Sequence, residues 1–193
     1  TAILTASPVN AADWLGTVSS SWFLAGNWSP ATLPASITNV TINNGGLPNP
    51  ATVDSAGAVA SRVDLGSAAG QSGTLNIDGG TLTALRYRVG FLGTGTVNIS
   101  NGGLLSAGVY TTAADSAGSR GTINISGAGS RLNTAQLYVA ADANTIGQVT
   151  VQNGGSFTAS QTIVGAVDAL ANGTLTITNA TANTGILTVR ETG

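Results

Sequence analysis

The chain has 193 residues, with six basic residues, all Arg, and eight acidic ones, so its formal net charge is −2. This balance, with no basic patch, predicts that nucleic acid is not a partner. The absence of Cys, His and Met excludes disulfides, thiol and imidazole catalysis and the usual zinc sites. No apolar run approaches the 18 or so residues of a membrane helix, so we expect no membrane insertion by this chain.

Residues 1–37 are predicted to form an N-terminal arm followed by a cap. The arm contains a short apolar stretch with Ile3 and Leu4 that ends at Pro8. Only 5% of all residues are aromatic, yet four of them follow within 15 residues: Trp14, Trp22, Phe23 and Trp28. Such a cluster is typical of a hydrophobic plug over the open end of a repeat structure. A carbohydrate-binding aromatic platform is the alternative.

Residues 39–46 have the sequence Asn-Val-Thr-Ile-Asn-Asn-Gly-Gly, which matches a motif that recurs later in the chain. We therefore interpret this segment as the first copy of the repeat, and residues 38–193 as the repeat part. The next copy starts 35 residues further on. An insertion is expected near residues 47–50, because Pro48 and Pro50 interrupt a ladder of hydrogen bonds.

From residue 51 onward the chain repeats the motif Gly-Thr-φ-Asn-φ, in which φ is Leu, Val or Ile. The leading glycines stand at positions 73, 95, 121, 147 and 173, so the steps are 22, 26, 26 and 26 residues. A fixed period of this size is typical of a solenoid. The alternation of apolar and polar residues predicts strands with one buried face. We expect the glycines of the motif to be corners.

Each repeat continues with two further short strands, the first anchored by a single apolar residue such as Leu82 or Leu105. Like strands of successive coils are expected to pair in parallel, with the rest of the coil as the crossover. The sequence thus predicts an all-β, single-stranded parallel β-helix (a β-solenoid) of about six coils of 22–26 residues. Its inward ladder is expected to contain Leu75, Ile77, Val97, Ile99, Ile123, Ile125, Val149, Val151, Leu175 and Ile177. Two packed antiparallel sheets would not explain the constant step.

The last strand of the chain contains Ile186, Leu187 and Val189 and has no polar cap after it. Either the native protein continues there, or another element docks on this end. Together with Ile3 and Leu4 of the arm, these residues form a predicted assembly interface. One subunit's last coil would pair with the next subunit's cap or arm, a contact that propagates into a filament.

The extended motif Gly-Thr-φ-Asn-φ-x-Asn-Gly-Gly resembles the passenger-associated repeat of autotransporters and related bacterial surface proteins. The pairs Asp13-Trp14 and Asn27-Trp28, with Pro34 ahead of residues 39–42, also resemble the start of such passengers. The resemblance covers about residues 13–179. It implies a right-handed β-helix that is secreted or displayed on a bacterial surface, often with adhesion, biofilm or scaffold roles. Its export signal would already have been removed from this numbering.

Three carboxylates occupy comparable loops: Asp115, Asp142 and Asp168 stand six, five and five residues before a Gly-Thr-type strand. Stacked along one edge, they would form a cation site or the acidic cluster of a polysaccharide-active enzyme. Ordinary loop solvation and Asx-turns are the favoured interpretation. The calcium repeat Gly-Gly-x-Gly-x-Asp is absent, and we expect no cofactor, catalytic residue or metal ligand.

The polar residues of the motif, such as Thr96 and Asn98, are expected to point outward in regular ranks. Ice-binding solenoids present Thr arrays of this kind. Cross-strand hydrogen bonding is the favoured explanation here, because Asn and Gln interrupt the Thr ranks.

Together these observations favour a non-catalytic extracellular or cell-surface β-solenoid, a passenger-like stalk or adhesin module. A subunit of a self-assembling extracellular filament is the alternative, and an ice-binding protein or polysaccharide-active enzyme is less favoured. The expected partners are further copies of the chain or a ligand on a host or cell surface.

Overall fold

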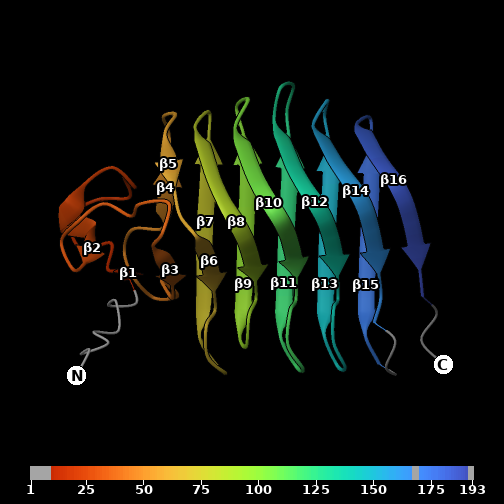
Figure 1. Cartoon of the computed structure of the whole chain (residues 1–193), viewed down its shortest axis with the longest axis horizontal. Helices are drawn as coiled ribbons and strands as arrows, with labels where there is room; N and C mark the ends of the chain where they lie inside the picture. Colours follow the sequence, from red (N-terminus) through yellow and green to blue (C-terminus); the bar gives the residue numbers. More distant parts are fainter. Residues whose placement is uncertain (1–9, 167–169, 191–193) are drawn as a thin grey trace, which may run out of the picture.

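The computed structural model describes residues 10–166 and 170–190 and is nearly all β (Figure 1). A larger sheet contains β1 (Ala11–Trp14), β2 (Trp28–Ser29), β3 (Asn39–Ile42), β5 (Ala58–Val59), β6 (Arg62–Leu65), β8 (Thr81–Val89), β10 (Leu104–Ala113), β12 (Arg131–Val139), β14 (Ser156–Val164) and β16 (Thr181–Val189). A smaller sheet contains β4 (Ala51–Val53), β7 (Ser72–Asp78), β9 (Thr94–Ser100), β11 (Arg120–Ser126), β13 (Ile146–Gln152) and β15 (Asn172–Thr178). One short 3-10 helix, η1 (Ala25–Asn27), precedes β2.

Successive coils place one strand in each sheet and stack in parallel along the molecule, which confirms the predicted β-solenoid (Figure 1). The repeat stays in register throughout the smaller sheet: Gly73 pairs with Gly95, and Gly121 with Gly147. In the larger sheet, eight strands from β1 to β16 follow one another in parallel order. The stack therefore has about seven turns instead of the six expected, because β1 adds a parallel strand ahead of β3, the segment that was counted as the first coil.

From β7 onward each coil has two long strands where three short ones were expected, whereas β4, β5 and β6 are three short strands of one coil. The second and third predicted strands are continuous, so that β8 contains both Leu82 and Tyr87 as buried residues. Between them, two consecutive residues point outward, and this changes the phase of the alternation. In β10 the same place contains a bulge between Ala107 and Tyr110. A change of phase breaks the period-2 pattern, which is why the pattern suggested two separate strands.

The inward ladder forms the centre of the hydrophobic core. Eight of its ten members are buried: Leu75, Ile77, Val97, Ile99, Ile123, Ile125, Val149 and Val151. The other two belong to β15, the last strand of the smaller sheet, where Leu175 is half-buried and Ile177 is 43% exposed. Full burial of such a side chain stabilises the fold by about 1.5–3 kcal/mol. The coils therefore owe most of their stability to neighbours on both sides.

The interpretation of residues 39–46 as the first repeat copy is wrong. β3 pairs with β6 in the larger sheet, so Val40 and Ile42 stack on Val63 and Leu65. The strand that stacks under the Gly-Thr motif is β4, which pairs with residues 75–77. Both sheets have the same alternation of inward apolar and outward polar residues. A short alternating segment therefore does not reveal which sheet it joins.

The leading glycine of the motif is not a corner. Gly95 lies inside β9, and a Cβ atom there would clash with the backbone nitrogen of Gly90. Gly90 itself has a φ of +74° and makes the corner that ends the preceding coil. A glycine inside the strand is thus required by the close approach of another backbone segment. Gly102, with a φ of +81°, is a corner as expected.

The N-terminal end of the stack is covered by the aromatic cluster. Trp14, Trp22 and Trp28 are buried, and their rings meet edge to face with centroids 4.9 and 4.6 Å apart. Phe23 is half-buried and packs against the core. β2 pairs antiparallel with β1, while β1 pairs in parallel with β3. The first parallel strand of the solenoid therefore lies within residues 1–37, the segment assigned from sequence to the arm and cap.

Candidate functional site

The outer face of the smaller sheet carries regular polar ranks. The Asn98 side chain donates a hydrogen bond to Asn76 Oδ1 at 3.0 Å, and Asn124 donates to Asn98 Oδ1 at 2.9 Å. This amide ladder confirms the cross-strand interpretation for this rank. Its members bond mainly to one another, so the ladder stabilises neighbouring coils.

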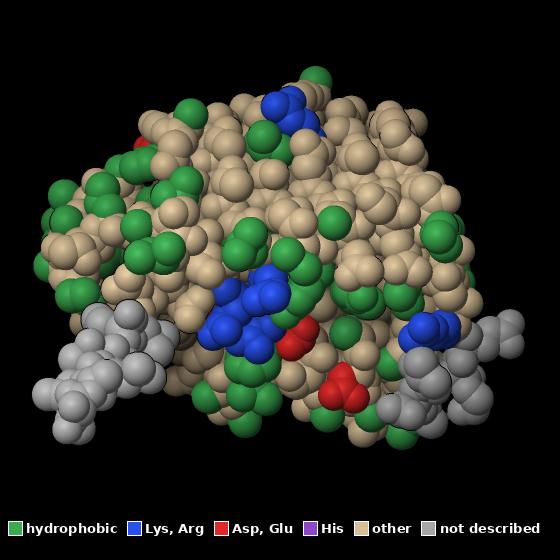
Figure 2. Space-filling model, in the orientation of Figure 1, with side chains coloured by type: hydrophobic (Ala, Val, Ile, Leu, Met, Phe, Trp, Pro, Cys, Tyr) green, Lys and Arg blue, Asp and Glu red, His purple; other side chains and the backbone are tan. Residues whose placement is uncertain are grey.

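One half of the larger sheet's outer face has a different chemistry, and we call it the Arg–Tyr face. In-register pairing aligns Arg62, Arg86 and Tyr110 in one rank. The adjacent rank contains Asp64, Arg88, Thr112 and Tyr138. Figure 2 shows a cluster of basic side chains on this side of the molecule, with apolar and acidic side chains next to it. The face therefore gathers three of the chain's six arginines and two of its three tyrosines in one place.

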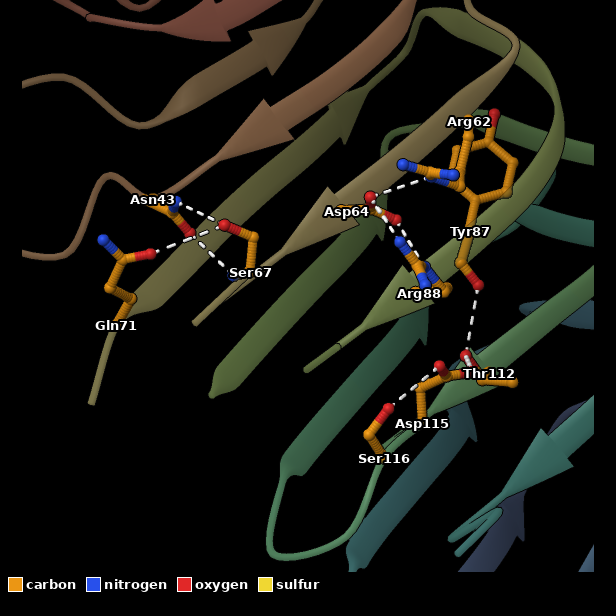
Figure 3. Close-up of polar contacts among 10 residues, drawn as sticks. All are labelled: Asn43, Arg62, Asp64, Ser67, Gln71, Tyr87, Arg88, Thr112, Asp115 and Ser116. Carbon is orange, nitrogen blue, oxygen red and sulfur yellow. Dashed lines mark hydrogen bonds and ion pairs between the residues drawn. The ribbon is translucent and has the colours of Figure 1, made fainter. Parts of the chain in front are cut away.

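Asp64 organises the basic part of this face (Figure 3). Arg88 donates from Nε to Oδ1 and from Nη2 to Oδ2, both at 2.6 Å, and Arg62 Nε donates to Oδ2 at 2.8 Å. Although only 4% of Asp64 is exposed, its two oxygens have strong charge-assisted partners. Two guanidinium groups share one carboxylate, so this cluster keeps one excess positive charge.

Arg88 is held in place from two sides. Its guanidinium carbon lies 3.3 Å from the centroid of the Phe91 ring, a cation–π contact. Burial lowers the pKa of Arg88, but its hydrogen bonds and ion pair with Asp64 outweigh that effect and raise the pKa overall. The guanidinium is therefore a fixed positive charge beside the next feature of the face.

A pocket of about 260 Å³, which we call the tyrosine pocket, opens beside this cluster. It is lined by Tyr110, Thr112, Asp115, Tyr138 and Ala141. The two tyrosine rings stand at 84° with centroids 6.3 Å apart. Thr112 Oγ1 donates to Asp115 Oδ1 at 2.9 Å. The pocket thus combines two aromatic walls with an oriented carboxylate.

The pocket lies where Ala141 is smaller than the residue at the equivalent corner of the preceding coil, Asp115. The Asp115 N–H bonds to Gly90 O, and the Ala141 N–H bonds to Ala114 O one coil further on. Asp115 and Ala141 therefore occupy equivalent corner positions. The methyl group of Ala141 leaves free space above it, next to Tyr138.

Asp115 is electrostatically unusual. Burial raises its pKa above the ordinary value of 3.8, and the charge of Asp64 adds to this. The hydrogen bonds from Thr112 and Ser116 and the charge of Arg88 act in the opposite direction without cancelling the rise. Oδ1 accepts from Thr112 Oγ1, and Oδ2 accepts from Ser116 Oγ at a long 3.5 Å. Burial therefore outweighs the donors that the protein supplies to this carboxylate.

The stacked acidic edge, which was the less favoured interpretation of the three loops, is not formed by Asp115 and Asp142. Because Asp115 is equivalent to Ala141, Asp142 lies one position further along its corner. Asp168 lies outside the described residues. Within residues 10–166 and 170–190, no group of three or more Asp, Glu, His or Cys side chains could hold a metal ion. Asp115 belongs instead to the tyrosine pocket.

None of the residues of the Arg–Tyr face was predicted from the sequence to be functional. A signal was nevertheless present, since Arg62, Arg86 and Tyr110 follow one another at intervals of 24 residues. That spacing places them in one outward rank once the register is known. The bulge in β10 hid this relationship because it shifts the alternation within the strand.

The predicted assembly interface is described only at its C-terminal part. Ile186, Leu187 and Val189 of β16 are 58%, 54% and 67% exposed. Ile3 and Leu4 lie outside the described residues. β16 pairs with β14 on one side and forms the edge of the larger sheet on the other. No helix in the described part of the chain is long and apolar enough to span a membrane.

No protein-family model matches the chain, and comparisons with curated proteins and with solved structures found no match. The resemblance to the autotransporter repeat thus rests on the motif itself.

Proposed function

We propose that this chain is a non-catalytic binding and scaffold module of the bacterial cell surface or extracellular space. The observation that carries the proposal is the Arg–Tyr face on an otherwise uniform stack. Arg and Tyr are the residues that dominate the energetics of protein binding surfaces. Here they project from consecutive coils of one rigid sheet, so binding costs little conformational entropy. The motif's resemblance to passenger repeats supports the extracellular location.

An adherence assay tests this proposal. Fluorescent beads coated with the folded chain are mixed with bacterial cells and with cultured epithelial cells, beside albumin-coated beads. We expect the chain-coated beads to adhere above the albumin background on at least one cell type. The double variant Arg86→Ala/Tyr138→Ala should lose that adherence. Equal adherence of albumin and chain on every cell type would contradict the proposal.

Self-assembly through the C-terminal end is a second candidate function. It is favoured by the three exposed apolar residues of β16, which lie on an unpaired strand edge. Such an edge is a template for pairing with another chain. The proposed occupant is a second copy of this chain, since identical coils have matching spacing. In a filament, the contact would propagate from one copy to the next.

Negative-stain microscopy of the purified chain tests this second candidate. Regular fibres that disappear in Leu187→Asp would support it. Discrete monomers at high protein concentration would contradict it. Dimers without fibres would also contradict a filament, because they indicate a closed end-to-end contact.

A further inference from the structure

We propose that the tyrosine pocket is a binding site for one ring of a neutral glycan. The inference names a ligand class for the binding role proposed above, and in that sense rests on it. The shape of the pocket, its aromatic walls, its carboxylate and the charges around it all favour this ligand.

The dimensions of the pocket suit a single sugar ring. Pockets for drug-sized ligands have volumes of about 300–1,000 Å³, whereas this one has about 260 Å³. It is open to solvent on the outer face of the larger sheet, so a polymer can continue in both directions along the surface. A site of this kind binds one unit of a chain without enclosing its ends.

Tyr138 supplies the apolar wall. Its hydroxyl donates to Gln136 Oε1 at 3.0 Å, and its ring meets Tyr110 edge to face. These contacts fix the orientation of the ring before any ligand arrives. The face of an aromatic ring carries negative charge, and the axial C–H groups of a sugar carry weak positive charge. Stacking on Tyr138 therefore suits the apolar face of a pyranose.

Asp115 supplies the polar contact. One of its oxygens accepts the Thr112 hydroxyl, which orients the carboxylate. The other oxygen accepts from Ser116 Oγ at 3.5 Å, a long contact. The pKa of the carboxylate is raised mainly by burial, which these two donors do not offset. Two adjacent sugar hydroxyls can donate to one carboxylate, and such charge-assisted bonds are the strong ones. A diol thus provides what the unliganded carboxylate lacks.

The surrounding charges favour a neutral ligand over a charged one. An anion in the pocket would lie against Asp115, which repels it. A cation would meet the field of Arg88, which already acts on Asp115. Arg86 adds a second positive charge, with its guanidinium carbon 5.7 Å from the Tyr110 ring centroid. The pocket thus has a negative charge on one side and positive charges on the other. A neutral polyol is repelled by neither, whereas an anion or a cation is repelled by one of them.

Native affinity electrophoresis tests the site with four neutral polysaccharides: dextran, pullulan, galactomannan and hydroxyethylcellulose. We expect at least one of them to retard the chain. Asp115→Asn should weaken this binding at least about tenfold, the effect of one lost charge-assisted contact. Tyr138→Ala should also weaken it, because it removes the ring on which the sugar stacks. Asn133→Ala on the same strand as Tyr138, and Asp142→Asn in the neighbouring corner, are the matched controls and should bind normally.

Several results would overturn the inference. One is the failure of all four neutral polysaccharides to retard the chain. Another is retardation by polygalacturonate alone, which would indicate an anion site on the arginines. Competition by choline would indicate a cage for a cation. Retained adherence to cells without glycan binding would overturn this site but leave the proposed surface function standing.

Discussion

The outer faces of the two sheets belong to the same coils, but their polar side chains find hydrogen-bond partners in different ways. On the smaller sheet, like residues bond to like residues from coil to coil, as in the ladder through Asn98. On the Arg–Tyr face, unlike residues meet, and two arginines share Asp64. A ladder of like residues needs nothing further. In the tyrosine pocket beside this face, burial of the Asp115 carboxylate is not offset by its hydrogen bonds, so the carboxylate can accept further hydrogen bonds from a ligand.

The largest loss of stability is expected from a substitution in the core, which would unfold the chain and so abolish both outer faces. Ile125→Asp places a charge among fully buried residues of the inward ladder. An unpaired buried charge costs several kcal/mol, so we expect loss of the β circular dichroism signal and no cooperative melting transition. Ile177→Asp is the matched control at the exposed end of the same ladder, and should cost less than about 1 kcal/mol. Equal effects of the two substitutions would refute the inward assignment.

Removal of the ion pairs of the Arg–Tyr face should cause the next largest loss of stability. Asp64→Ala leaves Arg62 and Arg88 without their shared carboxylate, and the Arg88 side chain is largely buried. Removing one partner of a buried pair costs about 3–5 kcal/mol. We expect about 2–4 kcal/mol here because the Arg62 side chain is 35% exposed and can reach water. Urea denaturation measures the change.

Asp13→Ala is the control for the Asp64 substitution. Asp13 is exposed and belongs to the same outward rank through Thr41. Its removal should change stability by less than about 0.5 kcal/mol. A similar loss of unfolding free energy in both variants would mean that the carboxylate of Asp64 contributes no more to stability than an exposed one.

The sequence predicted the repeated part of this molecule well, because a fixed period and an alternating pattern specify a stack. Gly-Thr-φ-Asn-φ places Val97 and Ile99 inward and predicts parallel pairing with the next copy. The same reasoning failed at residues 39–46, where a short alternating segment was assigned to the wrong sheet. Alternation reports that one face is buried and leaves open which sheet the strand joins.

The candidate site was less predictable than the fold for a physical reason. Tyr138 and Asp115 are 23 residues apart, and the relation between them depends on a bulge and a corner, which no short motif marks. The sequence placed Asp115 in an acidic loop, and the only partners considered for it there were other carboxylates. In the structure it faces tyrosines, because a shift of one position places Ala141 opposite it.

A smaller loss is expected from the smaller sheet's face. Asn98→Thr removes the central amide of the ladder and keeps a residue suited to a strand. Two partly exposed hydrogen bonds contribute about 1 kcal/mol together. Asn133→Thr is the matched control, since Asn133 is an exposed residue of β12 on the other sheet. If both variants have the same urea midpoint, the ladder does not stabilise the coils.

The smallest predicted change is a gain of stability, and it concerns Asp115. It is the sharpest test of the difference between the two faces. Because the folded-state pKa of Asp115 is raised, the folded chain holds this proton more tightly than the unfolded chain. The stability that the group contributes is present below the unfolded pKa and is lost as pH rises through the folded pKa. At about pH 7 the ionised carboxylate is therefore a net cost.

Asp115→Asn should accordingly raise the melting temperature at neutral pH, by about 1–3 °C. The gain should vanish near pH 3, below the ordinary value of 3.8, where both chains carry a neutral group. Asp142→Asn should give no comparable rise. A variant that is more stable yet no longer binds a neutral glycan would indicate that Asp115 is retained for its ligand, since stability is often lower where function requires an unsatisfied group. An unchanged or lowered melting temperature at neutral pH would mean that Thr112 and Arg88 already satisfy the carboxylate, and the contrast between the two faces would then disappear.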